Sequence, residues 1–473
     1  MKIIKNFLYN LSYQVFTLIV PLITIPYISR VLGPHGVGIN SFTTSVSQYF
    51  VLIATLGLTT YGQREIAYKR EHKEQVSKVF WEIELLSLIS SLFSLIIFIF
   101  FIFFITKKYE FYYLLQLVLV LSCAADISWF FNGLEMFKVT VLRNFLFKLI
   151  SVLAIFIFVK KPSDIGIYIL IISFSTFLGN ISLWSYLRKY LVKVKVKSLN
   201  IKVHVKPTLL LFIPQVAINI YVFLNKIMLG SISSVEQAGF FDSSDKIIRM
   251  CLTLITALTT VMMPRVASLF AKGDQEGVKK YLKNGFGIAL MLSFPLFFGI
   301  EGIASSFIPW FFGAQFYAVV NIIIVEAFAI IPISISQILG MQYLVPLGKT
   351  KLYSKAIICG AIINFGLNVP LIYYYSAVGT AVATVISEVF ITMLELFYVS
   401  RDLNVKLLFF ETWKPFLASF IMFFTILYLN SNIGVGFLCF FLDVVIGGFI
   451  YVLLLYVFKY KLFLSIAKKI FKK

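Results

Sequence analysis

The sequence predicts an all-α polytopic membrane protein. Sixty per cent of its 473 residues are hydrophobic and only 13% are charged, whereas roughly a quarter of the residues in a soluble domain carry charge. The apolar residues form long runs without the alternation of a membrane β-barrel strand. A helix of about 20 apolar residues crosses a bilayer with its backbone polar groups satisfied. These runs therefore indicate transmembrane helices.

Apolar windows between charged or turn-rich breaks predict about fourteen such helices of roughly 20 residues each. Their centres lie near residues 18, 49, 94, 121, 150, 175, 218, 252, 294, 326, 362, 386, 422 and 447. The first run is long, and no small-residue cleavage site follows it. We therefore expect it to remain in the protein as a helix instead of being removed as a signal peptide.

The distribution of basic residues predicts the orientation. The net charge of +21 comes from 42 Lys and Arg against 21 Asp and Glu. Most of the cations fall in segments that lie on one side of the membrane, at 2–5, 63–80, 138–148, 188–206, 265–283, 349–355, 401–414 and 459–473. By the positive-inside rule this side is the cytoplasm, and both termini lie there. We expect these segments to meet anionic lipid headgroups and expect no nucleic acid as a partner.

An internal repeat organises the chain. Short matches keep an offset of about 201 residues. They pair Gln14-Val15 with Gln215-Val216, Gly38 with Gly239, Leu58-Thr-Thr60 with Leu258-Thr-Thr260, Arg64 with Arg265, and Glu74-Gln-Val76 with Glu276-Gly-Val278. An even number of expected helices precedes the second copy, so the two copies are parallel repeats.

The repeat predicts two lobes and a tail. We expect a six-helix N-lobe over 1–190, a basic linker over 188–207, a six-helix C-lobe over 208–400, and two further helices with a basic tail over 401–473. Two parallel lobes suggest a central cavity that opens alternately to either side. A duplication without a transport path is the alternative.

Charged residues at membrane depth are costly and are therefore candidates for function. In the eighth expected helix, Asp242, Asp245, Lys246 and Arg249 share one face. Their spacing lets Asp242 pair with Lys246 and Asp245 with Arg249. The stripe is interpreted either as a cavity wall or as a self-neutralising group that tolerates burial.

Helices seven and one supply further polar residues. Gln215, Asn219 and Lys226 share one face of the seventh, although Lys226 also has the reach to snorkel to the membrane surface. Gln14 lies on the polar side of the first helix, and Arg30 ends that helix beside three glycines and a proline. Arg30 is interpreted as a counter-charge at the outer mouth of the cavity or as an interfacial anchor.

Two prolines in the first helix, Pro21 and Pro26, each remove a backbone hydrogen bond and suggest a broken or bent helix. The stretch 28–41 that follows is expected to form the turn between the first two helices. It is not expected to be a phosphate-binding loop, because no strand precedes it.

Several acidic residues are candidates for coupling transport to an ion. They are Asp126, Glu301, Glu326, Glu388, Glu395 and Asp443. Asp126 and Glu326 are favoured because both are expected in the fourth helix of their repeat, and Asp242 and Asp245 complete the set of candidates. A satisfied interhelical hydrogen bond is the alternative for each.

No cofactor or metal is expected apart from a coupling H⁺ or Na⁺. The four cysteines have no CxxC spacing, and His35, His72 and His204 are expected in loops. No Walker motif, GxSxG or HExxH occurs in the sequence. We therefore expect no ATP hydrolysis and no hydrolytic catalysis, and we interpret the chain as a transporter, not an enzyme.

Four stretches resemble a known family. They are "ISRVLGPHGVGINSF" at 28–42, "DISWFFNGLEMFKVTVLRN" at 126–144, "LNKIMLGSISSVEQAGFFDSSDKI" at 224–247 and "MQYLVPLGKTKLY" at 341–353. They resemble the polysaccharide transporter family of oligosaccharide flippases, in the multidrug/oligosaccharidyl-lipid/polysaccharide exporter superfamily. Members often carry Gln where Asn132 stands and Asp where Asn225 stands, so no ion-coupling role is carried over to Asn225.

The resemblance implies that the protein moves undecaprenyl-diphosphate-linked oligosaccharide repeat units to the outer leaflet of a bacterial cytoplasmic membrane, for capsule, O-antigen or exopolysaccharide assembly. A polysaccharide polymerase and a chain-length regulator are the partners that it suggests. Arg30, Lys226, Lys246 and Arg249 would face the diphosphate. The alternatives are a multidrug or cation antiporter of the same superfamily, a membrane polymerase or glycosyltransferase, and a scaffold without transport.

Overall fold

The computed structural model describes the backbone of residues 2–433 and 436–471. Side chains are described within these ranges except at 2–15, 18, 213–215, 217–218, 220, 257–261, 264, 433 and 469–471. The described backbone is almost entirely helical and contains no strand. It divides into two compact units, Met1–Gly230 and Ser231–Lys473.

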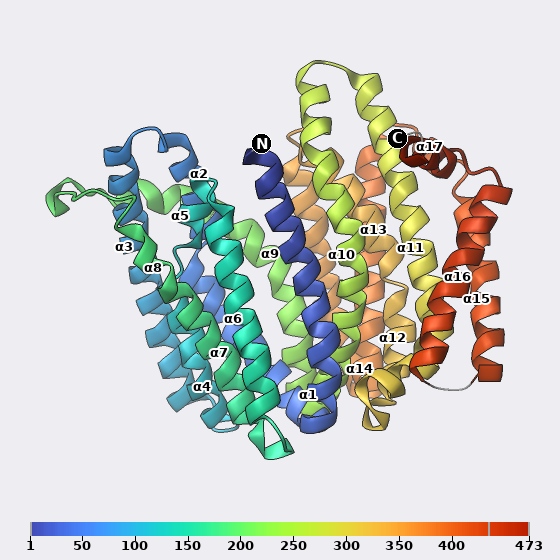
Figure 1. Cartoon of the computed structure of the whole chain (residues 1–473), viewed down its shortest axis with the longest axis horizontal. Helices are drawn as coiled ribbons and strands as arrows, with labels where there is room; N and C mark the ends of the chain where they lie inside the picture. The colour runs from blue at the N-terminus through green and yellow to red at the C-terminus, as the bar shows by residue number, and fades with distance from the viewer. Residues whose placement is uncertain (1, 434–435, 472–473) are drawn as a thin grey trace. The chain divides into compact units, whose positions relative to one another are not determined.

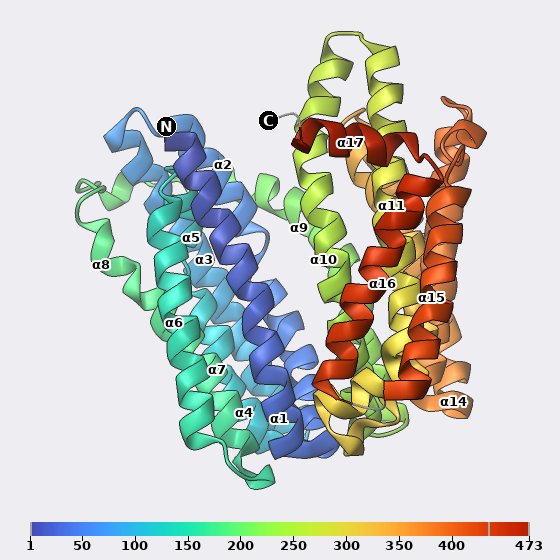
Figure 2. The ribbon, with the colours of Figure 1, turned by 45° about the vertical axis from the view of Figure 1, so that its right-hand side comes forward.

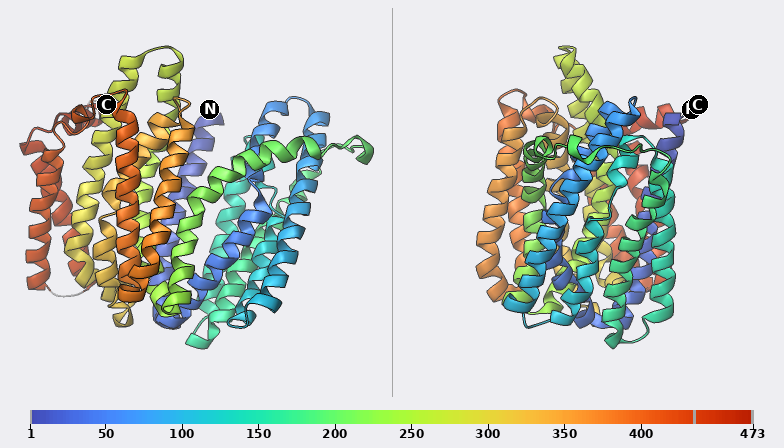
Figure 3. Two further views of the ribbon diagram at one scale, coloured as in Figure 1. Left: turned by 180° about the vertical axis from the view of Figure 1, so that it is seen from behind. Right: turned by 90° about the vertical axis from the view of Figure 1, so that its left-hand side faces the viewer.

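The first unit is formed by the helices up to α9 (Figure 1). They are α1 (Lys2–Thr55), α2 (Leu58–Lys69), α3 (Lys73–Phe100), the π-helix η1 (Phe101–Ile105), α4 (Glu110–Cys123), α5 (Ser128–Gly133), α6 (Phe137–Phe158), η2 (Pro162–Asp164), α7 (Ile165–Ser182), α8 (Trp184–Leu187), η3 (Val196–Ser198) and α9 (Lys202–Ile232). Helices α3, α4, α6 and α7 form a bundle in which α4 packs on both α3 and α7 (Figure 3).

The second unit holds the remaining elements. They are α10 (Val235–Ala271), α11 (Gln275–Phe312), η4 (Ala314–Phe316), α12 (Val319–Ala327), α13 (Ile330–Ser336), the π-helix η5 (Gln337–Leu344), α14 (Thr350–Ser400), η6 (Val405–Leu407), α15 (Trp413–Ile433), α16 (Phe437–Val457) and α17 (Lys461–Phe471). Helix α15 packs against both α11 and α16, and the short α17 lies across the end of α16 (Figure 2).

A single glycine makes the expected turn in α1. Gly33 has φ 67° and ψ 178° and separates two helical segments, and Pro34 begins the second. Glycine adopts a positive φ without steric cost, and proline is tolerated in a first helical turn. The turn expected within 28–41 is therefore confirmed at one residue. The helix continues through Pro21 and Pro26, so of the expected break or bend the break is absent and the bend stays a prediction.

The described residues include 10 helices that are long and apolar enough to cross a membrane. Two of them contain breaks, at Gly33 in α1 and at Ser376 in α14. Helices α9 and α10 also contain side chains outside the described set. An all-helical multi-pass membrane protein is thus confirmed, whereas the count of fourteen helices, the cytoplasmic termini and the lobe bounds stay predictions.

Polar caps fix the ends of the long helices that carry the candidate site. The Ser234 side chain accepts a hydrogen bond from the Gln237 backbone N–H at 3.3 Å, where α10 begins. Asp274 does the same for Gly277 at 2.8 Å, where α11 begins. Such caps satisfy backbone donors that lack a partner in a first helical turn. Gly273, with φ 74°, makes the turn that separates α10 from α11.

Candidate functional site

The charged stripe of α10 forms as two ion pairs. Lys246 Nζ lies 2.6 Å from Asp242 Oδ2, and Arg249 Nε lies 2.8 Å from Asp245 Oδ1. Both carboxylates are buried, whereas the Lys246 and Arg249 side chains are 40% and 51% exposed. The helix has no irregular residue here, so a spacing of four brings each pair together. The exposed cations can meet an anion while their buried carboxylates stay compensated.

A third carboxyl group contacts the same helix, α10. Glu326, on α12, is 2% exposed. Its Oε2 accepts a hydrogen bond from the Ser244 hydroxyl of α10 at 2.5 Å. Buried carboxyl groups are tolerated when hydrogen bonds satisfy them. Glu326 therefore contacts α10 at Ser244, which lies between Asp242 and Asp245 in the sequence.

The repeat counterpart of this cluster in the first unit is uncharged. By the offset of the repeat, Thr43 corresponds to Ser244. The amide group of Gln116, on α4, lies 2.8 Å from the Thr43 hydroxyl. A neutral amide therefore contacts the hydroxyl in the first unit, where a carboxyl group does so in the second.

Asp126 does not lie on a helix. Asp126 lies in the turn between α4 and α5, and its Oδ1 accepts a hydrogen bond from the Ser128 backbone N–H at 2.9 Å. The expectation that Asp126 and Glu326 occupy equivalent helices was therefore wrong, because α4 ends at Cys123. Asp126 is positioned as the acceptor of a short Asx-type turn.

The remaining predicted substrate residues lie in the first unit. Arg30 is an exposed residue near the end of the first segment of α1, and Asn219 and Lys226 are partly buried on α9. Each of the three interacts with a further residue. The side chains of Gln14 and Gln215 lie outside the described residues.

Two further acids are fully buried. Glu84 of α3 and Glu395 of α14 are both 0% exposed, and neither carboxylate oxygen of Glu84 has a hydrogen-bond partner among the described residues. Glu84 was absent from the candidates, and Glu395 was one of several. The sequence did contain a signal for Glu84. This glutamate lies within "WEIELLSLISS" at 81–91, an apolar and serine-rich run that is typical of a buried helix.

A buried chain of hydrogen bonds joins the expected linker segment 188–207 to helices α2 and α3 of the same unit. His204 Nδ1 lies 2.7 Å from the Tyr61 hydroxyl, and its Nε2 lies 3.0 Å from Glu82 Oε2. The Asn200 backbone N–H donates to Glu82 Oε1 at 2.7 Å. His204 is 3% exposed and belongs to α9, so its expected place in a loop was wrong. The local sequence reads as a basic linker, and its buried partners come from distant segments.

These features define a class of protein. Bundles of apolar helices carry buried ionisable residues, and intramembrane charges of this kind typically mark a transport path. The chain is a multi-pass membrane protein of the transporter class.

Comparison with known proteins gives the family. Residues 3–270 match the family described as "Polysaccharide biosynthesis protein", and the chain belongs to that family. It is 25% identical over 407 residues to the "Putative O-antigen transporter" of Escherichia coli (strain K12), covering 84% of this chain and 97% of that protein. It is also 25% identical over 186 residues to the "Probable low-salt glycan biosynthesis flippase Agl15" of Haloferax volcanii, covering 39% of each chain.

Solved structures share the fold. A lipid II flippase MurJ in an inward closed conformation superposes with a TM-score of 0.72 at 17% identity, over 96% of this chain and 99% of that chain. An inward-facing multidrug resistance MATE family transporter gives a TM-score of 0.65 at 13% identity, over 88% of this chain and 96% of the other. The shared fold agrees with the family match over 3–270, and this match and the relatives named above confirm the expected family resemblance and the interpretation as a transporter, not an enzyme.

Proposed function

We propose that the protein is a flippase that moves undecaprenyl-diphosphate-linked oligosaccharide repeat units from the inner to the outer leaflet. The observation that carries this proposal is the family match over 3–270, together with relatives named as an O-antigen transporter and a glycan biosynthesis flippase. The shared fold with a lipid II flippase supports the same chemistry, because that protein is also named for moving a lipid-linked substrate.

The proposed transport cycle is alternating access between two lobes, the N-lobe over 1–190 and the C-lobe over 208–400, with fourteen helices and both termini in the cytoplasm. The parallel repeat supports this topology. A polymerase and a chain-length regulator would act on the product at the outer leaflet. The surrounding phospholipids would receive the undecaprenyl chain.

Basic side chains would serve as counter-charges for the diphosphate. Arg30, Lys226, Lys246 and Arg249 are the proposed set, and Gln14, Gln215 and Asn219 would hydrogen-bond to sugars or phosphate. The exposed ends of Lys246 and Arg249 support this role. With the cell interior negative, moving two negative charges outward is favoured by about 4 to 5 kcal/mol per 100 mV. The membrane potential would then drive the cycle.

An H⁺ or Na⁺ gradient would add to this driving force through a carboxyl group. Asp126, Asp242, Asp245 and Glu326 are the proposed coupling residues. Glu326 is supported by its burial and by the Ser244 hydroxyl that donates to its Oε2. Burial disfavours the charged form of a carboxyl group, so a buried carboxyl group is suited to reversible protonation.

The test is flipping of a fluorescent undecaprenyl-diphosphate oligosaccharide in proteoliposomes with an imposed potential. We expect Arg30→Ala combined with Lys226→Ala to lower the rate at least tenfold, because the diphosphate loses two counter-charges. The matched control is Lys193→Ala with Lys195→Ala, two exposed lysines of the linker. An unchanged rate in the Arg30 and Lys226 variant would remove these residues from the substrate path.

The same proteoliposomes separate the flippase from a cation antiporter. An antiporter of cationic drugs favours an acidic cavity, whereas the α10 stripe presents its cations outward. Export of a lipophilic cation without flipping of the lipid diphosphate would replace the proposed function by the antiporter.

A further inference from the structure

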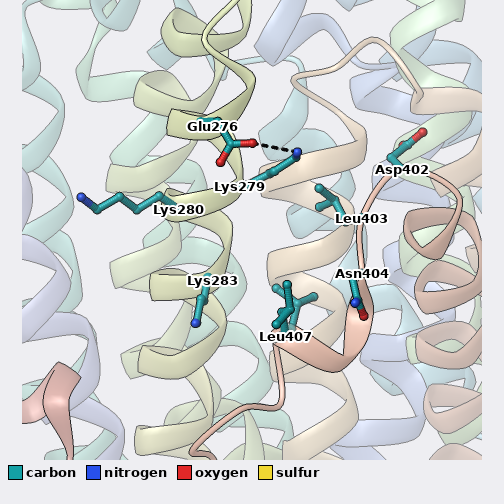
Figure 4. Close-up of a pocket in the computed structure, with 9 residues that line it drawn as sticks. Glu276, Lys279, Lys280, Lys283, Asp402, Leu403, Asn404 and Leu407 are labelled. Atoms are coloured by element: carbon teal, nitrogen blue, oxygen red, sulfur yellow. Dashed lines mark hydrogen bonds and ion pairs between the residues drawn. The ribbon is translucent and has the colours of Figure 1, made fainter.

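A basic pocket lies at the beginning of α11, in the unit Ser231–Lys473. It has a volume of about 360 Å³ and is bounded by the first turns of α11 and by the loop that follows α14 (Figure 4). Lysines 279, 280 and 283 come from the helix, and Leu403 and Leu407 come from the loop. None of these residues belongs to the proposed substrate path.

The pocket has an excess of positive charge. Its two acids already have cationic partners, since Glu276 pairs with Lys279 at 2.9 Å and Asp402 pairs with Lys349, which lies outside the pocket lining. Lys280 and Lys283 make no ion pair with the side chains that the structure describes. The Glu276 side chain is 86% exposed, and an exposed pair of this kind is weak. Lys279 is therefore available to a stronger anion.

Packing holds the loop in place against α11. The rings of Phe286 and Phe409 meet edge to face with their centroids 4.9 Å apart. The Lys283 ammonium lies 5.5 Å from the centroid of the Phe410 ring. Within the loop, the Asn404 side chain accepts a hydrogen bond from the Lys406 backbone N–H at 3.1 Å. Because the loop is already ordered, binding of a ligand costs less conformational entropy.

The pocket lies where membrane helices end. Helix α11 begins at Gln275, α14 ends at Ser400, and α15 begins at Trp413, and all three belong to candidate membrane spans. Large apolar side chains near this end face outward, with Leu407, Phe410 and Trp413 exposed at 56%, 62% and 58%. Aromatic residues at the ends of membrane helices lie at the level of the lipid headgroups.

We propose that this pocket binds the headgroup phosphate of an anionic phospholipid from the surrounding leaflet. Lys279 and Lys283 hold the phosphate, and Leu403 and Leu407 contact the upper acyl chains. Figure 4 shows Lys280 extending away from the loop, so this lysine adds charge at the rim. The combination of cations, an apolar wall and a position at the membrane boundary selects an anionic lipid over a neutral one.

The test uses the purified full chain in micelles of a neutral detergent. Phosphatidylglycerol or phosphatidylcholine is added, and the midpoint of thermal unfolding is followed. We expect phosphatidylglycerol to raise the midpoint by several degrees and phosphatidylcholine to leave it unchanged. Lys279→Gln with Lys283→Gln should weaken the apparent affinity for phosphatidylglycerol at least tenfold. Lys279→Arg with Lys283→Arg should retain it, because the charge remains.

A matched control removes the same charge elsewhere. Lys193→Gln with Lys195→Gln changes two exposed lysines of the other unit and should leave the response to phosphatidylglycerol intact. An equal loss in this control would show a general surface-charge effect and overturn the pocket. An equal rise with inorganic phosphate or with phosphatidylcholine would overturn the assignment to an anionic lipid. Lys279 and Lys283 are both exposed, so their variants should fold. The midpoint of thermal unfolding without added lipid verifies this.

Discussion

The second segment of α1 and helix α10 are repeat counterparts with different chemistry. At corresponding positions, Ser41 and Ser45 stand in the first unit and Asp242 and Lys246 in the second. In the first unit the Ser45 hydroxyl donates to the Ser41 carbonyl of its own helix at 2.7 Å, and the buried Ser41 hydroxyl has no hydrogen-bond partner among the described residues. In the second unit the same spacing holds an ion pair. Duplication thus kept the positions of the polar residues and changed their charge, so a response to ions is expected from the second unit.

The helices that carry these positions also differ in continuity. In the first unit, Leu56 and Gly57 interrupt the helix between the end of α1 and the start of α2. In the second unit, α10 is continuous from Val235 to Ala271. Gly57 has φ 75°, and α9 packs against it closely. The break makes room for α9, and the unbroken helix provides the regular spacing that the ion pairs need.

Of the substitutions that test this comparison, Gly57→Ala should lower the stability of the protein most. A left-handed conformation costs a non-glycine residue about 1 to 2 kcal/mol, and an added Cβ would lie 3.0 Å from the Phe212 backbone nitrogen. We expect a loss of about 3 kcal/mol in all, measured as a drop in the thermal midpoint in detergent. The control is Gly273→Ala, which has φ 74° and no atom within 4 Å of the new Cβ. Equal losses in both would show that close packing with α9 contributes nothing.

Lys246→Ala should have the next largest effect. It leaves the buried Asp242 carboxylate without the ammonium that lies 2.6 Å away. Removing one partner of a fully buried pair costs about 3 to 5 kcal/mol; the Lys246 side chain is 40% exposed, so we expect about 2 kcal/mol. Ser45→Ala, the corresponding change in the first unit, should cost less than about 1 kcal/mol. A larger loss for Ser45→Ala would reverse the comparison.

Glu326→Gln should have the smallest effect on stability. It gives the second unit the neutral amide that Gln116 provides in the first, and the Ser244 hydroxyl keeps an acceptor. We expect the thermal midpoint to change by an amount equivalent to less than about 1 kcal/mol. The rate of flipping should nevertheless lose its dependence on an imposed pH gradient. Retention of that dependence would exclude Glu326 as a coupling residue.

The sequence predicts the features that depend on local pattern. Long apolar runs predicted a helical membrane protein, and the spacing of Asp242, Lys246, Asp245 and Arg249 predicted two pairs that the structure contains. The glycine and proline at 33–34 predicted a turn, and Gly33 makes it.

Features that depend on distant segments were missed. The break at Ser376 lies between the helices expected near residues 362 and 386, but no glycine or proline at its centre marks this residue. His204 reads as a loop residue because its partners, Tyr61 and Glu82, lie more than a hundred residues away in sequence. Glu84 stands out only once its burial is known. Tertiary contacts decide each of these cases.

The buried chain through His204 also bears on how the basic linker meets a protease. Lys193, Lys195 and Lys197 are exposed and make the segment rich in trypsin sites. A protease must draw several residues around the scissile bond into an extended strand. Here the backbone N–H groups of Val192 and Asn200, on either side of these lysines, donate to Ser77 at 2.9 Å and to Glu82 at 2.7 Å. Trypsin should therefore cleave the folded protein here slowly, and faster once Glu82→Ala removes the acceptor of the Asn200 N–H and releases one end of the linker.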